Sequence, residues 1–359
     1  MRAGPHNDLT DVDGIAVGHH QRIGRGWLTG TTVVVAPPGT VGGVDVRGGA
    51  PGTRDTDALG PLNMVSEVDA ICLSGGSAYG LDATGGVVAW LEARQRGLRI
   101  GTEPHHVVPI VPSAVVFDLG AGGDFSRRPD ASFGLRAAAA ARPRQVAQGT
   151  VGAGTGAHAG VLKGAVGSAS VVTDGGVTVA ALVVVNCSGS PVDPATGTLL
   201  GARYALPGEL PPLRRPERDE VRTFAAMRLG PPPLNTTLAV VATDVALTKT
   251  ECTRVAGAGH DGMARAIAPI HQYVDGDVVF ALATGARELP VGDAVGFIRP
   301  EHTRFVDLGT IIAAAADVVA RAIVNGVLAA TSAGDMRSYG DQFPSSAGRR
   351  GTARSNATV

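Results

Sequence analysis

The chain has 359 residues, of which 44% are hydrophobic and 18% are charged, and its formal net charge is -1. That size predicts a globular protein with a large core, and the neutral balance excludes the basic footprint expected of a nucleic-acid-binding protein. The three cysteines, Cys72, Cys187 and Cys252, are too widely spaced for a disulfide framework or a paired zinc site. Together with the lack of a signal-peptide-like apolar core in the first residues, they predict a cytoplasmic protein.

The first half of the chain is rich in short strand-like runs separated by glycine-rich turns. Residues 70–97, AICLSGGSAYGLDATGGVVAWLEARQRG, predict a buried strand, a Gly/Ser turn capped by serine, and a helix ending near Gly97. A second strand-rich block is expected over residues 108–201. The segment 207–233, rich in proline and charge, predicts an exposed connection.

Beyond this connection we expect a strand at residues 236–245, a helix at 249–268, a strand at 276–285 and a long helix at 308–331. The long helix is very apolar, but Asp317 and Arg321, four residues apart, predict an amphipathic surface helix and no membrane span. The polar residues 332–359 predict a disordered tail or an oligomer contact. Clustered strands and helices favour layered sheets covered by helices over a doubly wound parallel sheet.

Three familiar kinds of site are not favoured. The stretch GAGTGAHAG, residues 152–160, has neither the residue order of a P-loop nor the acidic residue of a dinucleotide site. LSGGSAYG lacks the G-x-S-x-G order of a serine-hydrolase elbow. No pair of histidines has metal-ligand spacing, and His260 and Asp261 are interpreted as a helix cap. We therefore expect neither a cofactor nor a metal.

Asn235 and Thr236 stand between three prolines, residues 231–233, and a strand-like run. A threonine becomes a nucleophile when its own α-amine, freed by a cut before it, takes the hydroxyl proton. Prolines that hold the preceding backbone extended would present the Asn235 carbonyl to Thr236 for such a cut. From these residues alone, a stiff loop entering an ordinary strand remains the favoured interpretation.

Several long motifs, taken in order, make the chain resemble the DmpA/P1-type aminopeptidases of peptidase family S58. That family includes L-aminopeptidase/D-esterases, β-peptidyl aminopeptidases and nylon-oligomer hydrolases. The motifs cover nearly the whole chain up to about residue 331: NDLTDVDGIAVGHH, GTTVVVAP, GGAPGTRDTDAL, AICLSGGSAYGLDA, VPIVPSAVVFDLG, VGAGTGA, KGAVGSAS, NTTLAVVATDVALTK and HDGMARAIAPIHQYVDGDVVFALATG.

The resemblance implies an α/β fold, a four-layer α-β-β-α sandwich of the DmpA and ornithine-acetyltransferase type, made as an autoprocessed precursor. Residues 1–331 would form one hydrolase domain. Cleavage after Asn235 would divide the chain into an alpha chain, residues 1–235, and a beta chain, residues 236–359. The cleaved unit would assemble as a homo-oligomer, a tetramer or larger.

The same resemblance assigns the site. Thr236 would be the nucleophile, with its α-amine as the base, and Asn186 would donate a hydrogen bond to the oxyanion. Lys163 matches a lysine held near the nucleophile, and Asp275 and Asp277 match the pair that orients the amine and hydroxyl of Thr236. Each also has an ordinary interpretation: DGD as a hairpin turn, Asn186 as the start of a turn and Lys163 as a solvated loop residue.

Two departures from the family limit what can be carried over. Phe117 stands where well-studied peptidase members have a tyrosine that assists the oxyanion, and phenylalanine has no hydroxyl to donate. A threonine in place of the serine nucleophile also separates the chain from the β-peptidyl and D-esterase branches. We expect an amide hydrolase that releases N-terminal residues from small peptides or related amides. The alternatives are an acyltransferase of the ornithine-acetyltransferase type and a non-catalytic small-molecule-binding relative.

Overall fold

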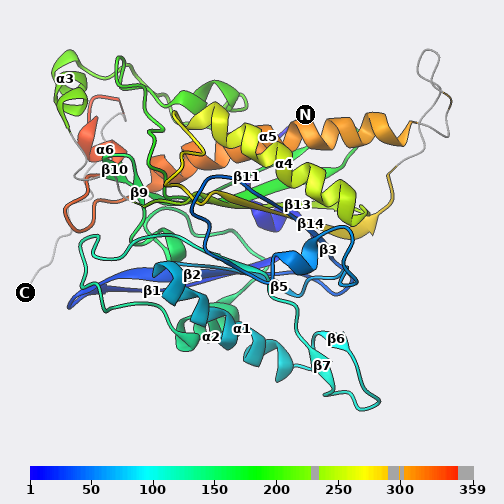
Figure 1. Ribbon diagram of the computed structural model, residues 1–359. Coiled ribbons are helices and arrows are strands. Elements are labelled where there is room, and N and C mark those ends of the chain that lie inside the picture. Colours follow the sequence, from blue (N-terminus) through cyan, green and yellow to red (C-terminus); the bar gives the residue numbers. More distant parts are fainter. Residues whose placement is uncertain (228–233, 290–298, 300–302, 347–359) are drawn as a thin grey trace, which may run out of the picture.

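A computed structural model describes residues 1–227, 234–289, 299 and 303–346 of the chain. Two five-stranded sheets lie face to face, with helices on the outer side of each (Figure 1). The first sheet has the order β1 (Ala16–Gly24), β2 (Trp27–Val35), β5 (Ala70–Ser74), β8 (Ser113–Val115), β4 (Thr53–Arg54). The second has the order β11 (Ala165–Val172), β12 (Thr178–Val185), β13 (Leu238–Val245), β14 (Val278–Arg287), β3 (Val41–Val46).

The helices complete the outer layers. The first sheet is covered by α1 (Ala83–Glu92) and α2 (Ala131–Ala140), and the second by α4 (Lys249–Ala266) and α5 (Arg304–Ala329) (Figure 1). The smaller elements are β6 (Leu98–Arg99), β7 (Val107–Val108), β9 (His158–Ala159), β10 (Leu162–Lys163), α3 (Arg218–Ala226), α6 (Tyr339–Gln342), and the 3-10 helices η1 (Leu9–Asp11), η2 (Asp57–Leu59), η3 (Ser77–Asp82), η4 (Gly152–Gly154) and η5 (Leu200–Tyr204). The predicted four-layer arrangement of helices and sheets is confirmed.

The alternation of side chains along β13 explains why both of its faces are apolar. Leu238, Val240 and Ala242 point between the two sheets, whereas Ala239 and Val241 pack with the helices outside. A strand buried on both faces reads as an uninterrupted apolar run, which is the pattern of this segment.

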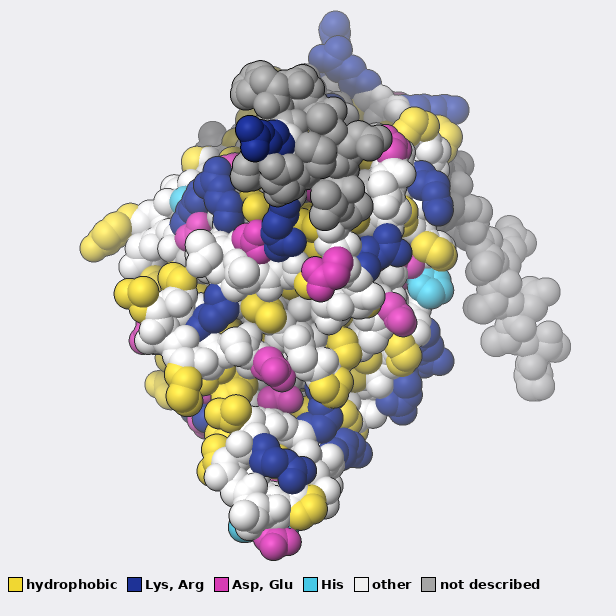
Figure 2. All heavy atoms as spheres, turned by 90° about the vertical axis from the view of Figure 1, so that its right-hand side faces the viewer, with side chains coloured by type: hydrophobic (Ala, Val, Ile, Leu, Met, Phe, Trp, Pro, Cys, Tyr) yellow, Lys and Arg dark blue, Asp and Glu magenta, His cyan; other side chains and the backbone are white. Residues whose placement is uncertain are grey.

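On the face that carries the β6 and β7 hairpin, side chains of both charge signs are interspersed with hydrophobic ones (Figure 2).

The segment 70–97 folds as a strand, a turn and helices, but its details differ from the prediction. The turn is followed first by η3, and α1 ends at Glu92, before Gly97. No serine hydroxyl caps these helices, since the N-cap residues are Gly76 and Asp82 and neither makes a side-chain cap. Ser74 instead bonds to Thr31 of the neighbouring strand, with their hydroxyl oxygens 2.8 Å apart.

The long helix α5 is a core helix, so the prediction of a surface helix is wrong. Asp317 does reach the outside, where it accepts a hydrogen bond from Arg265. Arg321 is buried because its guanidinium is neutralised by Glu209, with Arg321 Nε 2.7 Å from Glu209 Oε2. Within the described residues, α5 is the one helix long and apolar enough to cross a membrane by composition, and most of that stretch is buried in the protein.

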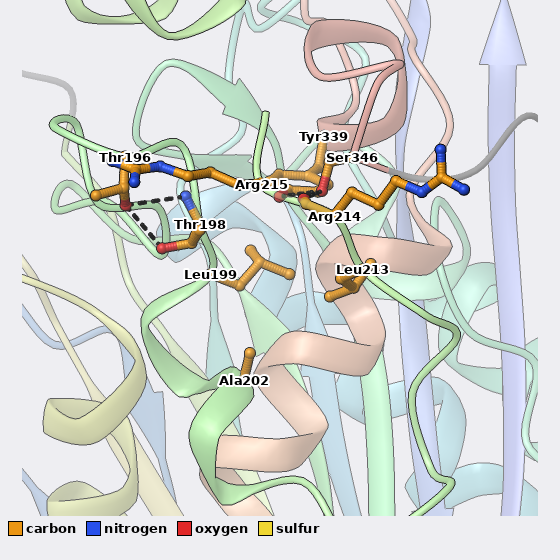
Figure 3. A pocket seen from close by; sticks show the side chains of 9 residues that line it. All are labelled: Thr196, Thr198, Leu199, Ala202, Leu213, Arg214, Arg215, Tyr339 and Ser346. Atoms are coloured by element: carbon orange, nitrogen blue, oxygen red, sulfur yellow. Dashed lines mark hydrogen bonds between the residues drawn. The ribbon is translucent and has the colours of Figure 1, made fainter. Parts of the chain in front are cut away.

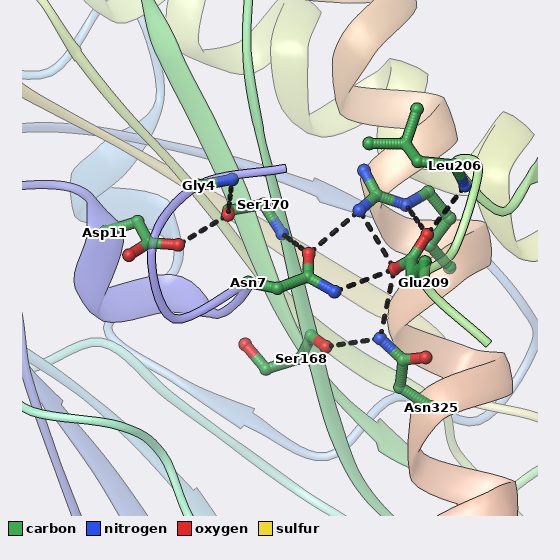
Figure 4. A network of polar contacts seen from close by, with 9 residues as sticks. Gly4, Asn7, Asp11, Ser168, Ser170, Leu206, Glu209 and Asn325 are labelled. Carbon is green, nitrogen blue, oxygen red and sulfur yellow. Dashed lines mark hydrogen bonds and ion pairs between the residues drawn. The ribbon is translucent and has the colours of Figure 1, made fainter. Parts of the chain in front are cut away.

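Glu209 is also the centre of a polar network that the sequence did not suggest (Figure 4). It accepts hydrogen bonds from Asn7, from Arg321 and from the backbone N–H of Leu206. Asn7 in turn accepts one from Ser170 of β11. The predicted connection is exposed over much of residues 207–227, as expected. Its start, however, is bound to α5 through the contact between Glu209 and Arg321.

The predicted disordered tail is wrong for residues 332–346. Tyr339 and Phe343 are buried, and Phe343 packs edge-on against Phe224 of α3, with ring centroids 5.2 Å apart. Ser346 donates to the backbone oxygen of Arg214. Burial of these aromatic side chains offsets the conformational entropy that is lost when the segment becomes ordered. Residues 347–359 lie outside the described residues.

Candidate active site

Strand register brings the predicted site residues to one edge of the second sheet. β12 and β13 are antiparallel, with Val184 opposite Leu238, and β13 and β14 are parallel, with Leu238 opposite Val278. The end of β12 therefore meets the starts of β13 and β14. Asn186, Thr236 and Asp277 flank these strands and come together although they are far apart in sequence. The prolines at 231–233 lie outside the described residues.

The peptide between Asn235 and Thr236 is buried, with 1% of Asn235 and 4% of Thr236 exposed. Thr236 Oγ donates to the Asn235 carbonyl oxygen at 2.6 Å, and the Gly276 N–H donates to the same oxygen at 3.1 Å. The Thr236 N–H is held by the Asn186 backbone oxygen at 2.7 Å. The hydroxyl thus sits against the carbonyl that it would attack, and a backbone donor already points at the oxygen where charge would develop.

The Asn186 side chain is held from both ends. Its Oδ1 accepts from the His158 N–H at 2.8 Å, and its Nδ2 donates to the Phe117 backbone oxygen at 3.3 Å. An amide nitrogen carries two hydrogens, so one remains for an oxyanion. Phe117 therefore contributes through its backbone oxygen, a role independent of the tyrosine hydroxyl it lacks. Sequence reasoning missed this role because backbone groups leave no residue-type signal.

Asp275 and Asp277 are fully buried and close to the candidate nucleophile, but their hydrogen bonds differ from those expected. Asp277 Oδ1 accepts from the Thr237 N–H at 2.7 Å, and Asp275 Oδ2 accepts from Ser188 Oγ at 2.7 Å. Asp277 thus holds Thr237, the residue after Thr236, whereas Asp275 holds Ser188, and no described hydrogen bond joins either carboxylate to the backbone nitrogen or hydroxyl of Thr236. Burial raises the pKa of Asp275; the Ser188 hydrogen bond opposes this, and the charge of Asp277 adds to it.

Lys163 is neither solvated nor hydrogen-bonded to Thr236 in the described structure. Its Nζ donates to the backbone oxygens of Gly154, Ala157 and Gly164 at 2.8, 2.9 and 2.8 Å. Burial lowers the pKa of Lys163 to about 7, and the nearby Asp118 opposes the shift. Two backbone oxygens of the glycine-rich stretch that begins at residue 152 thus bind this amine. Because His158 follows Ala157, the lysine supports the loop that orients Asn186.

Asp118 is a further buried group near the site that sequence reasoning missed. Its carboxylate accepts from Thr29 Oγ at 2.6 Å and from the Gly76 N–H at 2.7 Å. Burial raises the pKa of Asp118 to about 6. The only sequence signal was a lone carboxylate directly after an apolar run, which is also common at strand ends.

Two histidines near Asp277 were also missed from the sequence: His260 was misinterpreted, and His271 was not singled out. His260 lies within α4, so its interpretation as a helix cap is wrong. It is fully buried, its Nε2 lies 3.0 Å from the Asp45 backbone oxygen, and its ring meets that of His271 edge-on, with centroids 4.7 Å apart. His271 Nδ1 lies 2.8 Å from Asp277 Oδ2.

One cavity of about 380 Å³ lies elsewhere, between the connection after β12 and the C-terminal residues (Figure 3). Its lining residues are Thr196, Thr198, Leu199, Ala202, Leu213, Arg214, Arg215, Tyr339 and Ser346. None of them belongs to the group around Thr236. Across the described residues, no cluster of three or more His, Cys, Asp or Glu side chains is arranged to hold a metal ion.

The chain is similar to a family of peptidases and to several known proteins. The model of the family described as Peptidase family S58 matches residues 7–339. The chain is 50% identical over 352 residues to an uncharacterized aminopeptidase of Mycobacterium bovis, covering 95% of this chain and 99% of that protein. It is 33% identical over 290 residues to a 6-aminohexanoate-oligomer endohydrolase of Kocuria sp., covering 78% and 76%.

Two solved structures share the fold. A beta-aminopeptidase of Burkholderia sp. has a TM-score of 0.66 and 24% identity, covering 95% of this chain and 92% of that one. The L-aminopeptidase D-Ala-esterase/amidase of Ochrobactrum anthropi, described as a new variant among the Ntn hydrolase fold, has a TM-score of 0.67 and 22% identity, covering 92% and 88%. These likenesses confirm the predicted fold class.

Proposed function

Because the chain belongs to peptidase family S58, we propose that it is an autoprocessing aminopeptidase whose catalytic nucleophile is Thr236. Family membership and the aminopeptidase relatives make the chain an enzyme that hydrolyses peptide or amide bonds. The proposal adds the residue that performs the reaction and the step that exposes it. The observation that carries it is the Thr236 hydroxyl bonded to the Asn235 carbonyl, with the Gly276 N–H on the same oxygen.

Self-cleavage begins with attack of Thr236 Oγ on the Asn235 carbonyl carbon. The C–O bond forms as the C–N bond breaks, and the hydroxyl proton ends on the Thr236 nitrogen. Water then hydrolyses the resulting ester, which leaves a carboxylate on Asn235 and a free amine and hydroxyl on Thr236. The Gly276 N–H stabilises the oxyanion of this step.

Turnover repeats the chemistry on a substrate amide. The freed α-amine of Thr236 takes the hydroxyl proton as Oγ attacks, and then gives it to the leaving amine; the unperturbed pKa of an α-amine is about 8, which suits this exchange. Asn186 Nδ2 has one hydrogen free to donate to the oxyanion. Water then releases the acyl group. The substrates are small peptides or related amides with a free amino end, and amino-alkanoate oligomers are an informative second class because of the 33%-identical relative.

Two measurements test this function. Intact mass of the purified protein should show fragments of residues 1–235 and 236–359, with Thr236 as the new N-terminus. A set of aminoacyl amides should then be hydrolysed by the cut protein and not by Thr236→Ala. A single full-length species that persists on long incubation would refute the self-cleavage, and a cut protein that releases no amine from any amide would refute the turnover.

We also propose how the protein assembles and where it lies in the cell. We propose a homo-oligomer of the cut two-chain unit in the cytoplasm. Light scattering on the cut protein tests the first, and fractionation of cells tests the second.

A further inference from the structure

The turn between α4 and β14 places His271 directly against the carboxylate of Asp277. Asp277 Oδ2 lies 2.8 Å from His271 Nδ1 and accepts from the His271 backbone N–H at 3.2 Å. The other oxygen, Oδ1, accepts from the Thr237 N–H at 2.7 Å. One carboxylate therefore joins His271 to the residue beside the candidate nucleophile.

The backbone of His271 is shaped for this contact. Its φ is +57°, in the left-handed region, which non-glycine residues rarely adopt and which carries an energetic cost. In this conformation the backbone N–H and the ring nitrogen both reach the same carboxylate oxygen. A strained residue that makes two bonds to one buried acceptor indicates that the surrounding structure holds it there.

The contact also defines the state of the ring. A carboxylate only accepts hydrogen bonds, so His271 Nδ1 carries the proton. His271 Nε2 is buried and has no partner among the described residues. Its ring packs against His260, which is itself anchored at the Asp45 backbone oxygen. The imidazole is thus oriented from two sides.

Asp277 needs such a partner. Its side chain is fully buried, and the charge of Asp275 lies close enough to interact with it. A buried carboxylate is costly unless it is paired and hydrogen-bonded. In the part of the chain that the structure describes, its ion-pair partner is His271, and no lysine or arginine pairs with it.

We propose that His271 is a positioning residue for catalysis: its Nδ1–H holds the Asp277 carboxylate in the orientation that aligns the start of β13 and thereby the reactive groups of Thr236. The proposal rests on the proposed function. His271 acts through Asp277 and touches neither the cut peptide nor the acyl group.

The test uses two variants that both tolerate a left-handed backbone. His271→Gly removes the Nδ1 donor, and His271→Asn retains a side-chain N–H at nearly the same reach. For each, we would measure the rate of precursor cleavage, and then kcat and KM on an aminoacyl amide that the wild type hydrolyses. Gln95→Gly is the matched control, because Gln95 has a φ of +55° and lies outside the site.

We expect His271→Gly to slow both cleavage and kcat by at least about tenfold, because small misplacements of reacting groups are costly. KM should change by less than about threefold, since the loss falls on the reacting geometry. His271→Asn should recover most of both rates, and Gln95→Gly should match the wild type. Wild-type rates in His271→Gly, or equal impairment of the Asn and Gly variants, would overturn the proposal.

A nitrogen-15 NMR measurement separates this proposal from the proposed function. In labelled Thr236→Ala precursor, His271 should show the Nδ1–H tautomer, and Asp277→Asn should disturb it because an amide has one acceptor oxygen where two are needed. An undisturbed signal would overturn the pairing even if the protein cuts itself. A wild-type chain that never cuts, with the tautomer signal present, would instead overturn the function while the pairing stands.

Discussion

The side-chain hydroxyl of Thr236 donates a 2.6 Å hydrogen bond to the carbonyl oxygen of Asn235, the residue directly before it. The hydroxyl is therefore already in contact with the peptide that we propose to be cut, and both are buried. Thr237, the next residue, is also a buried threonine, but its hydroxyl has no hydrogen-bond partner among the described residues. The two adjacent hydroxyls thus form a natural comparison.

Thr236→Ala should remain a single chain, because no other hydroxyl contacts the Asn235 carbonyl in the described structure. Thr236→Ser should still cut, since it retains the hydroxyl. Thr237→Val has nearly the same shape and should cut at close to the wild-type rate. Mass spectrometry over time measures cleavage in all three variants. A folded Thr237→Val variant that stays uncut would contradict the assignment of Thr236 as the nucleophile.

Asn186→Asp should lower kcat by about 100-fold to 1,000-fold, the usual loss when one oxyanion donor is removed. The carboxylate retains the acceptor for the His158 N–H but has no hydrogen to donate. Steady-state kinetics on the cut protein would measure this loss, with KM little changed. A kcat within a few-fold of that of the wild type would show that Asn186 has only a structural role.

Acid should destabilise the protein partly through His260. Burial lowers the pKa of His260 to about 4 in the folded protein, and its bond to the Asp45 backbone oxygen only partly opposes this. Between pH 6.5 and 4 the unfolded chain therefore binds more protons at this residue, so stability falls as pH falls through that window. His260→Gln, which keeps a donor for Asp45, should remove up to about 3 kcal/mol of this loss.

Urea unfolding at pH 7 and pH 4 would measure the difference for His260. The free energy of unfolding of the wild type should fall more than that of His260→Gln. Equal losses in the two proteins would show that His260 accepts a proton as readily in the folded state as in the unfolded one.

Arg321→Met should lower the free energy of unfolding by about 3–5 kcal/mol, because it leaves Glu209 as a buried, unpaired charge. Arg222→Ala is the matched control, since its ion pair with Asp219 is on the surface and should contribute little. Because Glu209 and Arg321 lie on opposite sides of the proposed cut, the same variant should let the two fragments separate at lower urea. Denaturant titration and size exclusion would measure both effects.

Local pattern was enough for the main elements after residue 235. Apolar β-branched runs predicted β13 and β14, and the Thr248 and Glu251 capping box lies where the helix α4 was expected to begin. The long helix and the tail were misjudged for one reason. The burial of Arg321 and of Phe343 depends on partners distant in sequence, Glu209 and Phe224 of α3, which no local window contains.

The candidate site divides in the same way. Asn235 and Thr236 could be singled out from the sequence because the motifs around them resemble a known family. Their relation to Asn186 follows from the register of β12 and β13, and that to Asp277 from the register of β13 and β14. Lys163 was identified as important, but its three carbonyl partners could not be foreseen, since a backbone oxygen has the same identity at every residue.

The sequence by itself determined the strands β13 and β14 and the helices α4 and α5. These depend on side-chain period, which is a local property, whereas Asn235 and Thr236 were singled out because the motifs around them resemble a known family. Only the tertiary structure decided which atoms meet: the Gly276 N–H on the Asn235 carbonyl, His158 on Asn186, and His271 on Asp277. Such contacts depend on strand register and on loop conformation, because a shift of one residue would turn each of these groups away from its partner.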